Sequence, residues 1–500
     1  MNIVSILPFF VAIPLFAAFL ISLLGKKVKG IADAAGNIAA LSLFVCSLFA
    51  AFFSSLESPL IYKIGGWIPP YGISFVLDSL SAFMLIVINL VALLVSIFSV
   101  DYMKKFTSKW KFYTLFMLML AGMNGVVITG DLFNLFVFLE IASIASYALV
   151  AFGTERHELE AAFKYAVMGT VASLFILLGI VFLYSYTSTL NMADMAIVIS
   201  QNGPSKIILL VSAIFIMGFG LKSALIPFHA WLPDAHPSAP APISALLSGI
   251  LIKSLGIYAI CRIFYNVLGM TSAFSSILMF LGAISMVIGA ILAIGQWDFK
   301  RLLAYSSISQ VGYIVLGIGL NTPLGIMGGL FHLFNHSLFK SLLFLNSGAV
   351  EYATGTRDMR QMGGLAEKLP VTRNTNIIAS MSIAGIPPFG GFFSKLIIII
   401  ACVEAGHNQY ALCAVLVSIL TLAMYLKVLK NVFFGELSAK LTQIKKIPFF
   451  MKISMTMLAF LCLISGLLLI KPAKEVFLEK AAKVLYDGSD YKQIISKGLK

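Results

Sequence analysis

Charged residues are scarce in this sequence. Only 11% of its 500 residues are charged and 60% are hydrophobic, whereas soluble domains are about 25% charged. This composition excludes a soluble enzyme and indicates an all-α polytopic membrane protein. At about 20 apolar residues per span, the chain is long enough for about 14 transmembrane helices, and one membrane domain, residues 1–500, is the simplest division. The net charge of +14 would suggest nucleic acid in a soluble protein, but here the loops carry it, and we expect no nucleic-acid partner.

Cysteines and cofactor motifs are also scarce. The five cysteines are scattered through apolar runs, and no two of them form a CxxC pair: Cys46, Cys261, Cys402, Cys413 and Cys462. This spacing argues against an iron–sulfur cluster, a zinc site or a disulfide framework. The sequence has no P-loop and no GxGxxG fingerprint at a strand–helix turn. We therefore expect no cofactor, no metal and no redox or hydrolytic site in this chain by itself.

The hydrophobic runs predict the topology. They place fourteen spans at about residues 3–24, 31–53, 77–100, 112–129, 131–152, 161–186, 206–227, 242–264, 274–294, 301–320, 323–350, 375–403, 408–433 and 449–470. An even number of spans puts both termini on the same side of the membrane. The C-terminal tail, residues 471–500, follows the last span.

Basic residues gather in loops that all fall on one side of this topology. They are Lys26, Lys27 and Lys29 after the first span, Lys104, Lys105, Lys109 and Lys111 after the third, Arg357, Arg360, Lys368 and Arg373 after the eleventh, and Lys427, Lys430, Lys440, Lys445 and Lys446 after the thirteenth. The positive-inside rule makes these loops cytoplasmic and predicts both termini outside, although the basic tail goes against this bias.

Two of the predicted spans contain helix-breaking residues and a lysine. In span twelve the segment Gly385–Lys395 includes Pro387, Pro388, Gly390 and Gly391, and in span seven Lys222 precedes Pro227. Proline removes a backbone donor, and glycine tolerates unwound backbone. Irregular backbone at membrane depth persists only where protein or water surrounds it. We expect discontinuous helices 7 and 12, and a broken helix with an ionisable residue predicts an ion or proton site.

A faint internal repeat relates spans five and ten. A constant offset places Ser143 on Ser309, Tyr147 on Tyr313 and Gly153 on Gly319. Because an odd number of spans separates the two copies, the second would be inverted in the membrane. The pattern predicts two inverted five-helix repeats, residues 112–264 and 274–433.

Few charges lie within the hydrophobic runs. Among the basic residues we assign only five to the interior of a span: Lys164, Lys222, Lys253, Lys340 and Lys395. Each costs about 2.5 to 3.5 kcal/mol at the bilayer centre unless it is paired or hydrated. Lys164 begins its span beside a charged loop, so snorkelling to the interface explains it as well as function does.

Glu140 is the only carboxylate that we place deep in a span, and it is the natural counter-ion for a lysine. The protonation states of a buried Glu–Lys pair are coupled, so a proton moved onto a neighbouring group would bind or release the pair. This is the elementary step of an electrostatic proton pump. The alternative is a static ion pair between Glu140 and Lys222 that fixes helix packing.

Histidines accompany these charges in span eleven and in the linker after span seven. His332, His336 and Lys340 are spaced four residues apart, which stacks them on one helical face. Such a stripe could relay protons, whereas the alternatives are a metal site or polar groups that only pack the helix. His229 and His236, between Pro227 and Pro242, are candidates for the place where protons are taken up, although a rigid proline-rich turn needs no function.

These motifs in combination resemble one family over nearly the whole chain. The run Phe228–Pro237 before Lys253, the Glu140 span, the histidine stripe and the broken segment Gly385–Lys395 are similar to the antiporter-like subunits of respiratory complex I, membrane-bound hydrogenases and Mrp-type cation/proton antiporters. The run Gly66-Trp-Ile-Pro-Pro-Tyr-Gly-Ile, the lysine at position 395 and the short tail look most like the D-type subunit of Mrp antiporters.

The resemblance implies a function and residue roles. Glu140 and Lys222 would form the switching ion pair, Lys253 the central relay, the histidine stripe with Lys340 the bridge, and Lys395 the terminal donor towards the outer side. The chain would move protons in a prokaryotic plasma membrane, with sodium as the other candidate ion, among other hydrophobic subunits and lipid. A cation gradient would drive it. The alternatives are an ion-pumping subunit of a complex-I-like oxidoreductase or membrane-bound hydrogenase, with a redox module as partner, and a structural scaffold.

Overall fold

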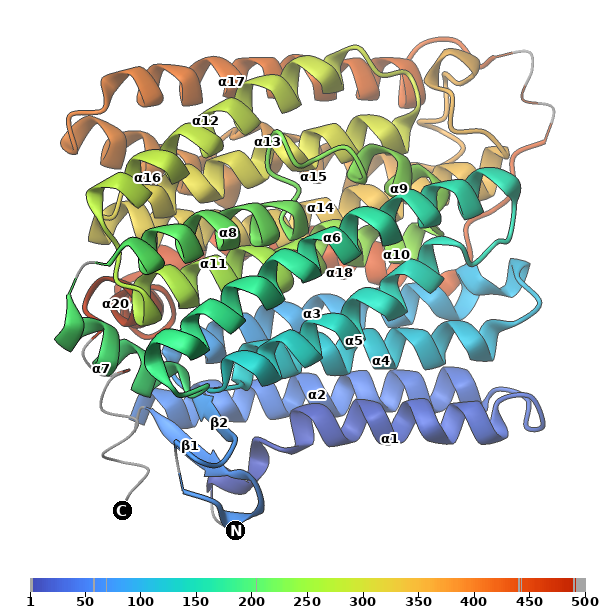
Figure 1. The fold of residues 1–500 in the computed structure, drawn as a ribbon. Helices are drawn as coiled ribbons and strands as arrows, with labels where there is room; N and C mark the ends of the chain where they lie inside the picture. Colours follow the sequence, from blue (N-terminus) through green and yellow to red (C-terminus); the bar gives the residue numbers. More distant parts are fainter. Residues whose placement is uncertain are drawn as a thin grey trace.

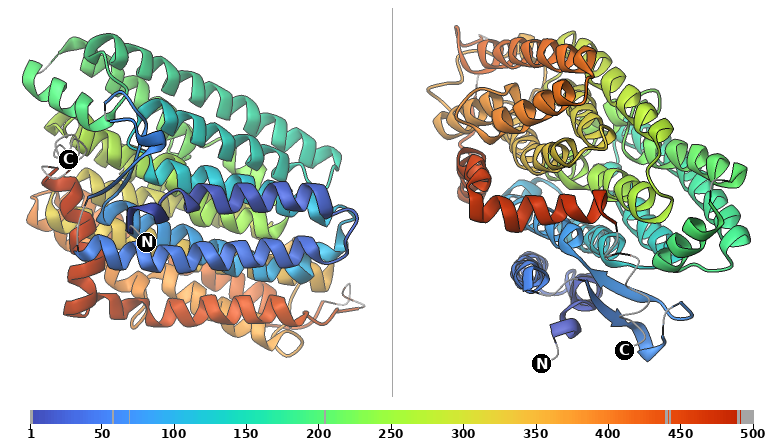
Figure 2. Two further views of the ribbon diagram at one scale, coloured as in Figure 1. Left: turned by 90° about the horizontal axis from the view of Figure 1, so that it is seen from below. Right: turned by 90° about the vertical axis from the view of Figure 1, so that its left-hand side faces the viewer.

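The computed structural model is a bundle of long helices that lie side by side (Figures 1 and 2). It describes residues 3–56, 59–68, 70–203, 205–438, 441, 443–488 and 491. Lys440, Pro69 and the last part of the predicted tail, residues 489–490 and 492–500, lie outside this described part. Eleven of the described helical segments are long and apolar enough to cross a membrane, so the polytopic helical fold is confirmed.

The first half of the chain contains most of the uninterrupted helices. They are α1 (Phe9–Leu24), α2 (Ile31–Leu56), α3 (Ser79–Tyr102), α4 (Lys109–Ile128), α5 (Leu132–Val150) and α6 (Arg156–Thr187). Asp78 and Asp131 cap α3 and α5, because each carboxylate accepts a hydrogen bond from a backbone N–H in the first turn of its helix. A short helix, α7 (Met192–Asn202), precedes α8 (Lys206–Lys222).

The middle of the chain departs from regular α-helix. Helix α9 (Leu232–Ser238) is followed by α10 (Ala241–Leu246), which continues through η4 (Leu247–Leu251), η5 (Lys253–Tyr258), α11 (Ala259–Cys261) and η6 (Arg262–Val267). The three η segments are π-helical. Wide turns of this kind are frequent at functional sites, and Lys253 begins one of them.

The second half returns to longer helices. They are α12 (Ser272–Ile294), α13 (Phe299–Gly319), α14 (Pro323–Thr354), α15 (Pro370–Ala384), α16 (Gly390–Glu404), α17 (Asn408–Val428) with its extension η8 (Leu429–Phe433), and α18 (Phe449–Ile464). The chain then makes short turns, η9 (Ser465–Leu469), α19 (Lys471–Ala473), η10 (Lys474–Glu479) and α20 (Lys480–Tyr486). The remaining short 3-10 segments are η1 (Ile3–Ile6), η2 (Ile64–Gly66), η3 (Met103–Lys105) and η7 (Met359–Gln361).

A small antiparallel sheet departs from the all-helical expectation. Strands β1 (Leu60–Lys63) and β2 (Ser74–Leu77) pair with Leu60 opposite Leu77. The sheet lies at one end of the bundle with η1 and α20 (Figure 1). Lys480 Nζ donates a hydrogen bond to the Ser55 carbonyl oxygen, which fixes α20 to the end of α2. We call this the hairpin end. The loops at 25–30 and 103–108 lie at the opposite, basic end.

Helix α14 forms the centre of the bundle. It packs against α3, α10, α13, α15, α16 and α18. Every side chain from Gly325 to Val350 is buried, including its histidines and lysine. A helix that is buried all round would ordinarily be apolar throughout, so the polar groups on α14 require partners within the protein.

Candidate functional site

The structure brings Glu140 and Lys222 together. Glu140 on α5 and Lys222 at the end of α8 form an ion pair, with 3.6 Å between Glu140 Oε1 and Lys222 Nζ. The ammonium also donates hydrogen bonds to Ser143 Oγ at 2.9 Å and Tyr147 OH at 3.4 Å. On the other side, the Ser173 hydroxyl donates to Glu140 Oε1. The lysine side chain is 5% exposed and the carboxylate 27%, so the pair is asymmetric and its acid faces the bundle surface.

Lys253 lies in the π-helical segment with no carboxylate beside it. Its ammonium donates to the carbonyl oxygens of Ser248 and of Gly249, the latter at 2.8 Å. No ion pair joins Lys253 to an acid within the described part of the chain. Because the wide π-turn leaves carbonyl oxygens pointing at the side chain, the backbone supplies the partners that a counter-ion would otherwise supply.

Hydrogen bonds lead from Ser248, whose carbonyl oxygen Lys253 contacts, towards Lys340. The Ser248 hydroxyl lies 2.7 Å from that of Ser307, and the Ser307 hydroxyl donates to the Leu303 carbonyl oxygen at 2.8 Å. The same carbonyl accepts from Lys340 Nζ at 2.9 Å. Lys340 Nζ also lies 3.3 Å from the hydroxyl of Tyr425. The hydroxyls of Ser248 and Ser307 thus lie between the two lysines, and each lysine donates to a backbone carbonyl oxygen, which accepts a hydrogen bond but does not pass a proton on.

His332 and His336 lie on the same face of α14 as Lys340. Their ring centroids are 6.4 Å apart. His332 Nδ1 is 2.9 Å from Ser394 Oγ, one residue before Lys395. Neither ring nitrogen of His336 has a hydrogen-bond partner in the described structure, although the residue is fully buried. Buried polar groups of this kind are ordinarily satisfied by internal water.

Lys395 bridges the break in the second discontinuous helix. Helix α15 ends at Ala384, and Gly385 adopts φ +82°, which favours glycine. In an unbroken helix the Ile383 carbonyl would accept from residue 387, but Pro387 has no N–H. Lys395 Nζ takes that place at 2.8 Å, and it lies 4.7 Å from the centroid of the Tyr313 ring.

The unwound segment is shorter than the sequence suggests. Helix α16 begins at Gly390, so Gly390 and Gly391 belong to its first turn, and only residues 385–389 are non-helical. These two glycines allow close packing: a Cβ on Gly391 would lie 1.9 Å from the Ser382 carbonyl oxygen. The other break, Ser223 to Trp231, follows α8 and contains Pro227 as expected. The bonds before Pro227 and Pro388 are cis.

The histidines of the first break have different environments. His236 on α9 is fully buried and stacks on Phe344 with 4.7 Å between ring centroids, and neither of its ring nitrogens has a partner among the described residues. His229 is only half-buried. His236 therefore lies in the interior with the lysines, whereas His229 lies nearer the surface.

A polar cavity of about 430 Å³ opens at the basic end, beside the residues that follow His236. We call it the vestibule. Its charged lining residues are Lys105, Glu158, Asp298, Lys300, Glu351, Arg357 and Asp358. At its inner wall Lys300 Nζ lies 3.1 Å from Glu351 Oε2 and donates to the Ala239 carbonyl oxygen at 3.1 Å. Sequence reasoning missed this pair, because both residues lie near span ends, where charge is ordinary.

The structure changes our list of buried charges at two positions. Lys164 is half-exposed and pairs with Glu160 at 2.8 Å and Asp234 at 3.3 Å, so it is an interfacial residue. Arg262, which we left out, is almost fully buried. Its two terminal nitrogens donate to the two oxygens of Asp78 at 2.7 and 2.9 Å. Pairing across 184 residues leaves no local pattern in a sequence.

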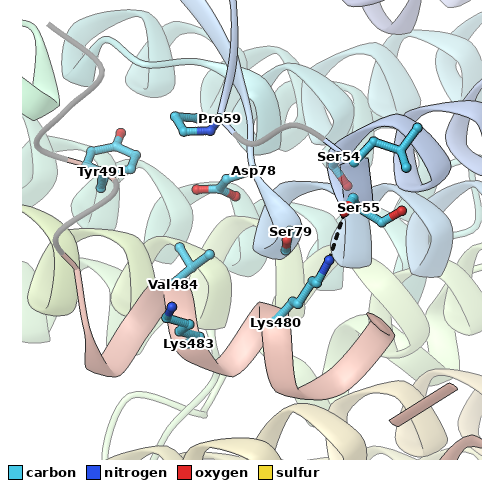
Figure 3. A pocket seen from close by; sticks show the side chains of 10 residues that line it. Ser54, Ser55, Pro59, Asp78, Ser79, Lys480, Lys483, Val484 and Tyr491 are labelled. Atoms are coloured by element: carbon cyan, nitrogen blue, oxygen red, sulfur yellow. Dashed lines mark hydrogen bonds between the residues drawn. The ribbon is translucent and has the colours of Figure 1, made fainter. Parts of the chain in front are cut away.

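Asp78 also borders a cavity of about 240 Å³ at the hairpin end (Figure 3). In this view Lys480 reaches the Ser55 carbonyl, and Tyr491 lies on the same side as Asp78. Burial raises the pKa of the Asp78 carboxyl, but the charge and hydrogen bonds of Arg262 outweigh burial, so that pKa lies below its usual value. None of the lysines from 222 to 395 lines this cavity, and we regard the Asp78–Arg262 pair as structural.

Two family models match parts of this chain. Residues 129–421 match the family model described as NADH:quinone oxidoreductase/Mrp antiporter, TM, and residues 67–113 match NADH-Ubiquinone oxidoreductase (complex I), chain 5 N-terminus. The chain is 38% identical to the N-type subunit of the NADH-quinone oxidoreductase of Desulforudis audaxviator over 85% of both chains. It is 35% identical to the D-type subunit of the Na(+)/H(+) antiporter of Alkalihalophilus pseudofirmus over 87% of this chain and 88% of the other.

Solved structures are similar over the full length. A chain of the Mrp complex from Dietzia sp. superposes with a TM-score of 0.91 at 30% identity, covering 99% of this chain and 100% of that one. A chain of the membrane-bound sulfane sulfur reductase, an archaeal respiratory membrane complex, superposes with a TM-score of 0.88 at 31% identity, covering 100% and 99%.

Proposed function

Because this chain belongs to the family of membrane subunits shared by NADH:quinone oxidoreductases and Mrp antiporters, we propose that it is a proton-translocating subunit of the D type found in Mrp antiporters. It works in a multi-subunit membrane complex with other hydrophobic subunits. The observation that carries the proposal is the series of buried titratable groups through the middle of the bundle, from Glu140 and Lys222 to Lys395. A bundle with a purely structural role would not be expected to contain this series, since each buried lysine destabilises the protein by several kcal/mol.

We infer fourteen spans. Eleven segments qualify by length and hydropathy alone, and α8 with α9, α14, and α15 with α16 supply three more. Helices α8, α15 and α16 are only 15 to 17 residues long. Each is shorter than a complete span, as expected of one part of an interrupted transmembrane helix. With fourteen spans the basic loops face the cytoplasm and both chain ends face outward.

The lysines of the two breaks support the inverted repeat 112–264 and 274–433. Lys222 contacts Tyr147, and Lys395 lies over the ring of Tyr313. These two tyrosines are the residues that the sequence offset places on one another. A lysine at each break therefore meets the equivalent tyrosine of its own repeat, which is the arrangement that duplication of one unit would produce.

Proton movement follows from the charge pattern. Protons enter at the vestibule and reach His236, Lys253 and Lys340, while Lys395 returns them towards the outer side. When Lys222 is charged it attracts Glu140, and when a proton arrives on Glu140 the attraction ends and the lysine's charge repels that of Lys253 instead. Each step transfers one proton between an amine, imidazole or carboxylate and its neighbour through hydroxyls or water, without a covalent intermediate.

A cation gradient is the driver that the Na(+)/H(+) antiporter relatives favour. A redox module is the second candidate, because the NADH-quinone oxidoreductase relative is 38% identical. The test is to purify the tagged complex, identify its subunits by mass spectrometry, and measure sodium-dependent collapse of a pH gradient in vesicles from cells without other antiporters. Collapse with only hydrophobic partners supports the antiporter. Iron–sulfur partners without sodium-dependent collapse would replace it with the redox pump.

A further inference from the structure

Helix α15 presents a polar face to the interior of the bundle. Thr372, Asn376 and Ser380 are spaced four residues apart and form one line, and Thr375 and Ser382, seven residues apart, form a second line on the other flank of the same broad face. All five are between 0% and 4% exposed. The helix packs with α14, α17 and α18, where apolar side chains would be the ordinary choice. We call these five residues the α15 stripe.

The α15 stripe does not satisfy its own hydrogen bonds. The Thr375 hydroxyl donates to Asn346 Oδ1 on α14 at 2.9 Å, and the Ser380 hydroxyl donates to Asn376 Oδ1 at 3.2 Å. Four further polar atoms have no partner in the described structure: Asn346 Nδ2, Thr372 Oγ1, Asn376 Nδ2 and Ser382 Oγ. Buried groups left in this state are ordinarily bonded to internal water, so each of these four atoms is a candidate contact for a water molecule.

One end of the α15 stripe lies at the basic end of the bundle and the other lies beside the break between α15 and α16. Thr372 is two residues after the start of α15, which follows the basic loop of Arg360 and Lys368. Ser382 directly precedes Ile383, whose carbonyl oxygen accepts the hydrogen bond of Lys395. At 1.5 Å per residue the stripe is about 15 Å long. It therefore runs from the basic end of the bundle to the lysine at the break.

We propose that the α15 stripe is a hydrated proton pathway that connects Lys395 directly to the basic end. This proposal rests on the proposed function and adds a second cytoplasmic connection, separate from the vestibule. A proton from bulk water would pass along hydroxyls and waters to the neutral amine of Lys395, and the resulting ammonium would bind the Ile383 carbonyl. The amide of Asn376 cannot carry the proton, and it positions water instead. A polar seam that only packs helices would need no water.

Accessibility of cysteines along the helix tests the proposal. Asn376→Cys, Ser380→Cys and Ser382→Cys are exposed one at a time to Ag⁺ on the basic side of sealed vesicles that hold the intact complex. Protection of each thiol from later alkylation is read by mass spectrometry of its own peptide, so the native cysteines need not be removed. Met381→Cys is the control, because Met381 lies on the opposite face of the same helix and packs against the apolar core.

We expect the stripe cysteines to react at least about tenfold faster than Met381→Cys, since a thiol in dry apolar packing is inert. Equal, slow reaction at positions 376, 380, 382 and 381, or reaction only from the hairpin side, would overturn the proposal. If Asn376→Cys does not fold, the conservative change Ser380→Cys still tests whether water reaches the stripe. Repeating the labelling in a Glu140→Gln background separates the two proposals, because water access survives there even where transport is lost.

A functional variant completes the test. Asn376→Leu should slow proton transport by about tenfold or more, because the leucine removes the amide that positions water in the pathway. The same substitution at the exposed neighbour Asn374 should leave transport unchanged. Equal rates in Asn376→Leu and the unsubstituted complex would contradict a conducting role.

Discussion

Lys395 donates a hydrogen bond to the carbonyl oxygen of Ile383 over 2.8 Å, across the break between α15 and α16. The bond joins the two half-helices, because Ile383 has lost its helical partner to Pro387. Hydrogen bonds from a charged donor are about twice as strong as those between neutral groups. Loss of the proton from Lys395 therefore weakens the junction, and the geometry of the break is coupled to the charge it carries.

Close packing at this junction gives a first prediction. Gly391→Ala places a methyl group 1.9 Å from the Ser382 carbonyl oxygen, so the half-helices must separate. We expect a loss of about 1–3 kcal/mol in stability, as for other overpacked sites, and a clear decrease in proton transport. Thermal melting of the purified complex measures the first and vesicle acidification the second. Gly295→Ala, where the nearest atom is 3.8 Å away, should change neither.

A substitution at His336 distinguishes a role in proton transfer from a role in helix packing. Replacing a buried polar group that has no partner by an apolar group of similar shape is neutral or stabilising, so His336→Phe should melt at the same temperature or higher. If His336 carries protons, transport should nevertheless fall by about a hundredfold or more. A stable variant with normal transport would assign His336 to packing alone.

The hydroxyl link between Lys253 and Lys340 gives a third prediction. Ser307→Ala removes the group that joins Ser248 to the Leu303 carbonyl. Since the lysines themselves are unchanged, we expect slower transport, by about tenfold, with assembly intact. Ser307→Thr keeps the hydroxyl and should restore much of the rate. Equal loss in both variants would point to packing at this position instead of proton transfer.

The Asp78–Arg262 pair predicts a pH-dependent stability at the hairpin end. Because the pKa of Asp78 is lowered in the folded protein, its contribution is complete above the ordinary aspartate pKa of about 3.9 and is lost as the pH falls below it. Asp78→Asn leaves Arg262 buried without an anion, which costs about 3–5 kcal/mol at neutral pH. Melting temperatures from pH 7 to pH 3 should therefore decrease less in Asp78→Asn than in the parent. Parallel curves would exclude this role of the pair.

Several features of the candidate site leave local patterns in the sequence. Prolines and glycines mark the breaks at Pro227 and Gly385, and spacing by four places the histidines of α14 on one face. Lysines inside apolar runs are so costly that Lys222, Lys253 and Lys395 stand out without any structure. From the sequence we expect Glu140 to contact a lysine such as Lys222, because it is the one carboxylate that we place deep in a span and a buried charge requires a counter-ion. The roles assigned to these residues remain predictions.

Other features could not be read from local pattern. Arg262 lies at the end of a hydrophobic run, where a charged residue is expected at the membrane interface. It meets Asp78 only in the folded bundle. Lys300 and Glu351 likewise meet from the start of α13 and the end of α14. The sheet at residues 60–77 and helix α20 are stabilised by contacts with distant elements, such as that of Lys480 with Ser55, and such contacts leave no periodic signal.

Proton transport in energised vesicles tests the central claim most directly. Glu140→Ala and Lys395→Ala remove the two ends of the buried series, and Lys164→Ala removes a half-exposed lysine as the control. All three complexes are compared at equal assembly in the same vesicles. We predict that Glu140→Ala and Lys395→Ala abolish proton movement while Lys164→Ala transports normally. Normal acidification in either of the first two would contradict the proton path.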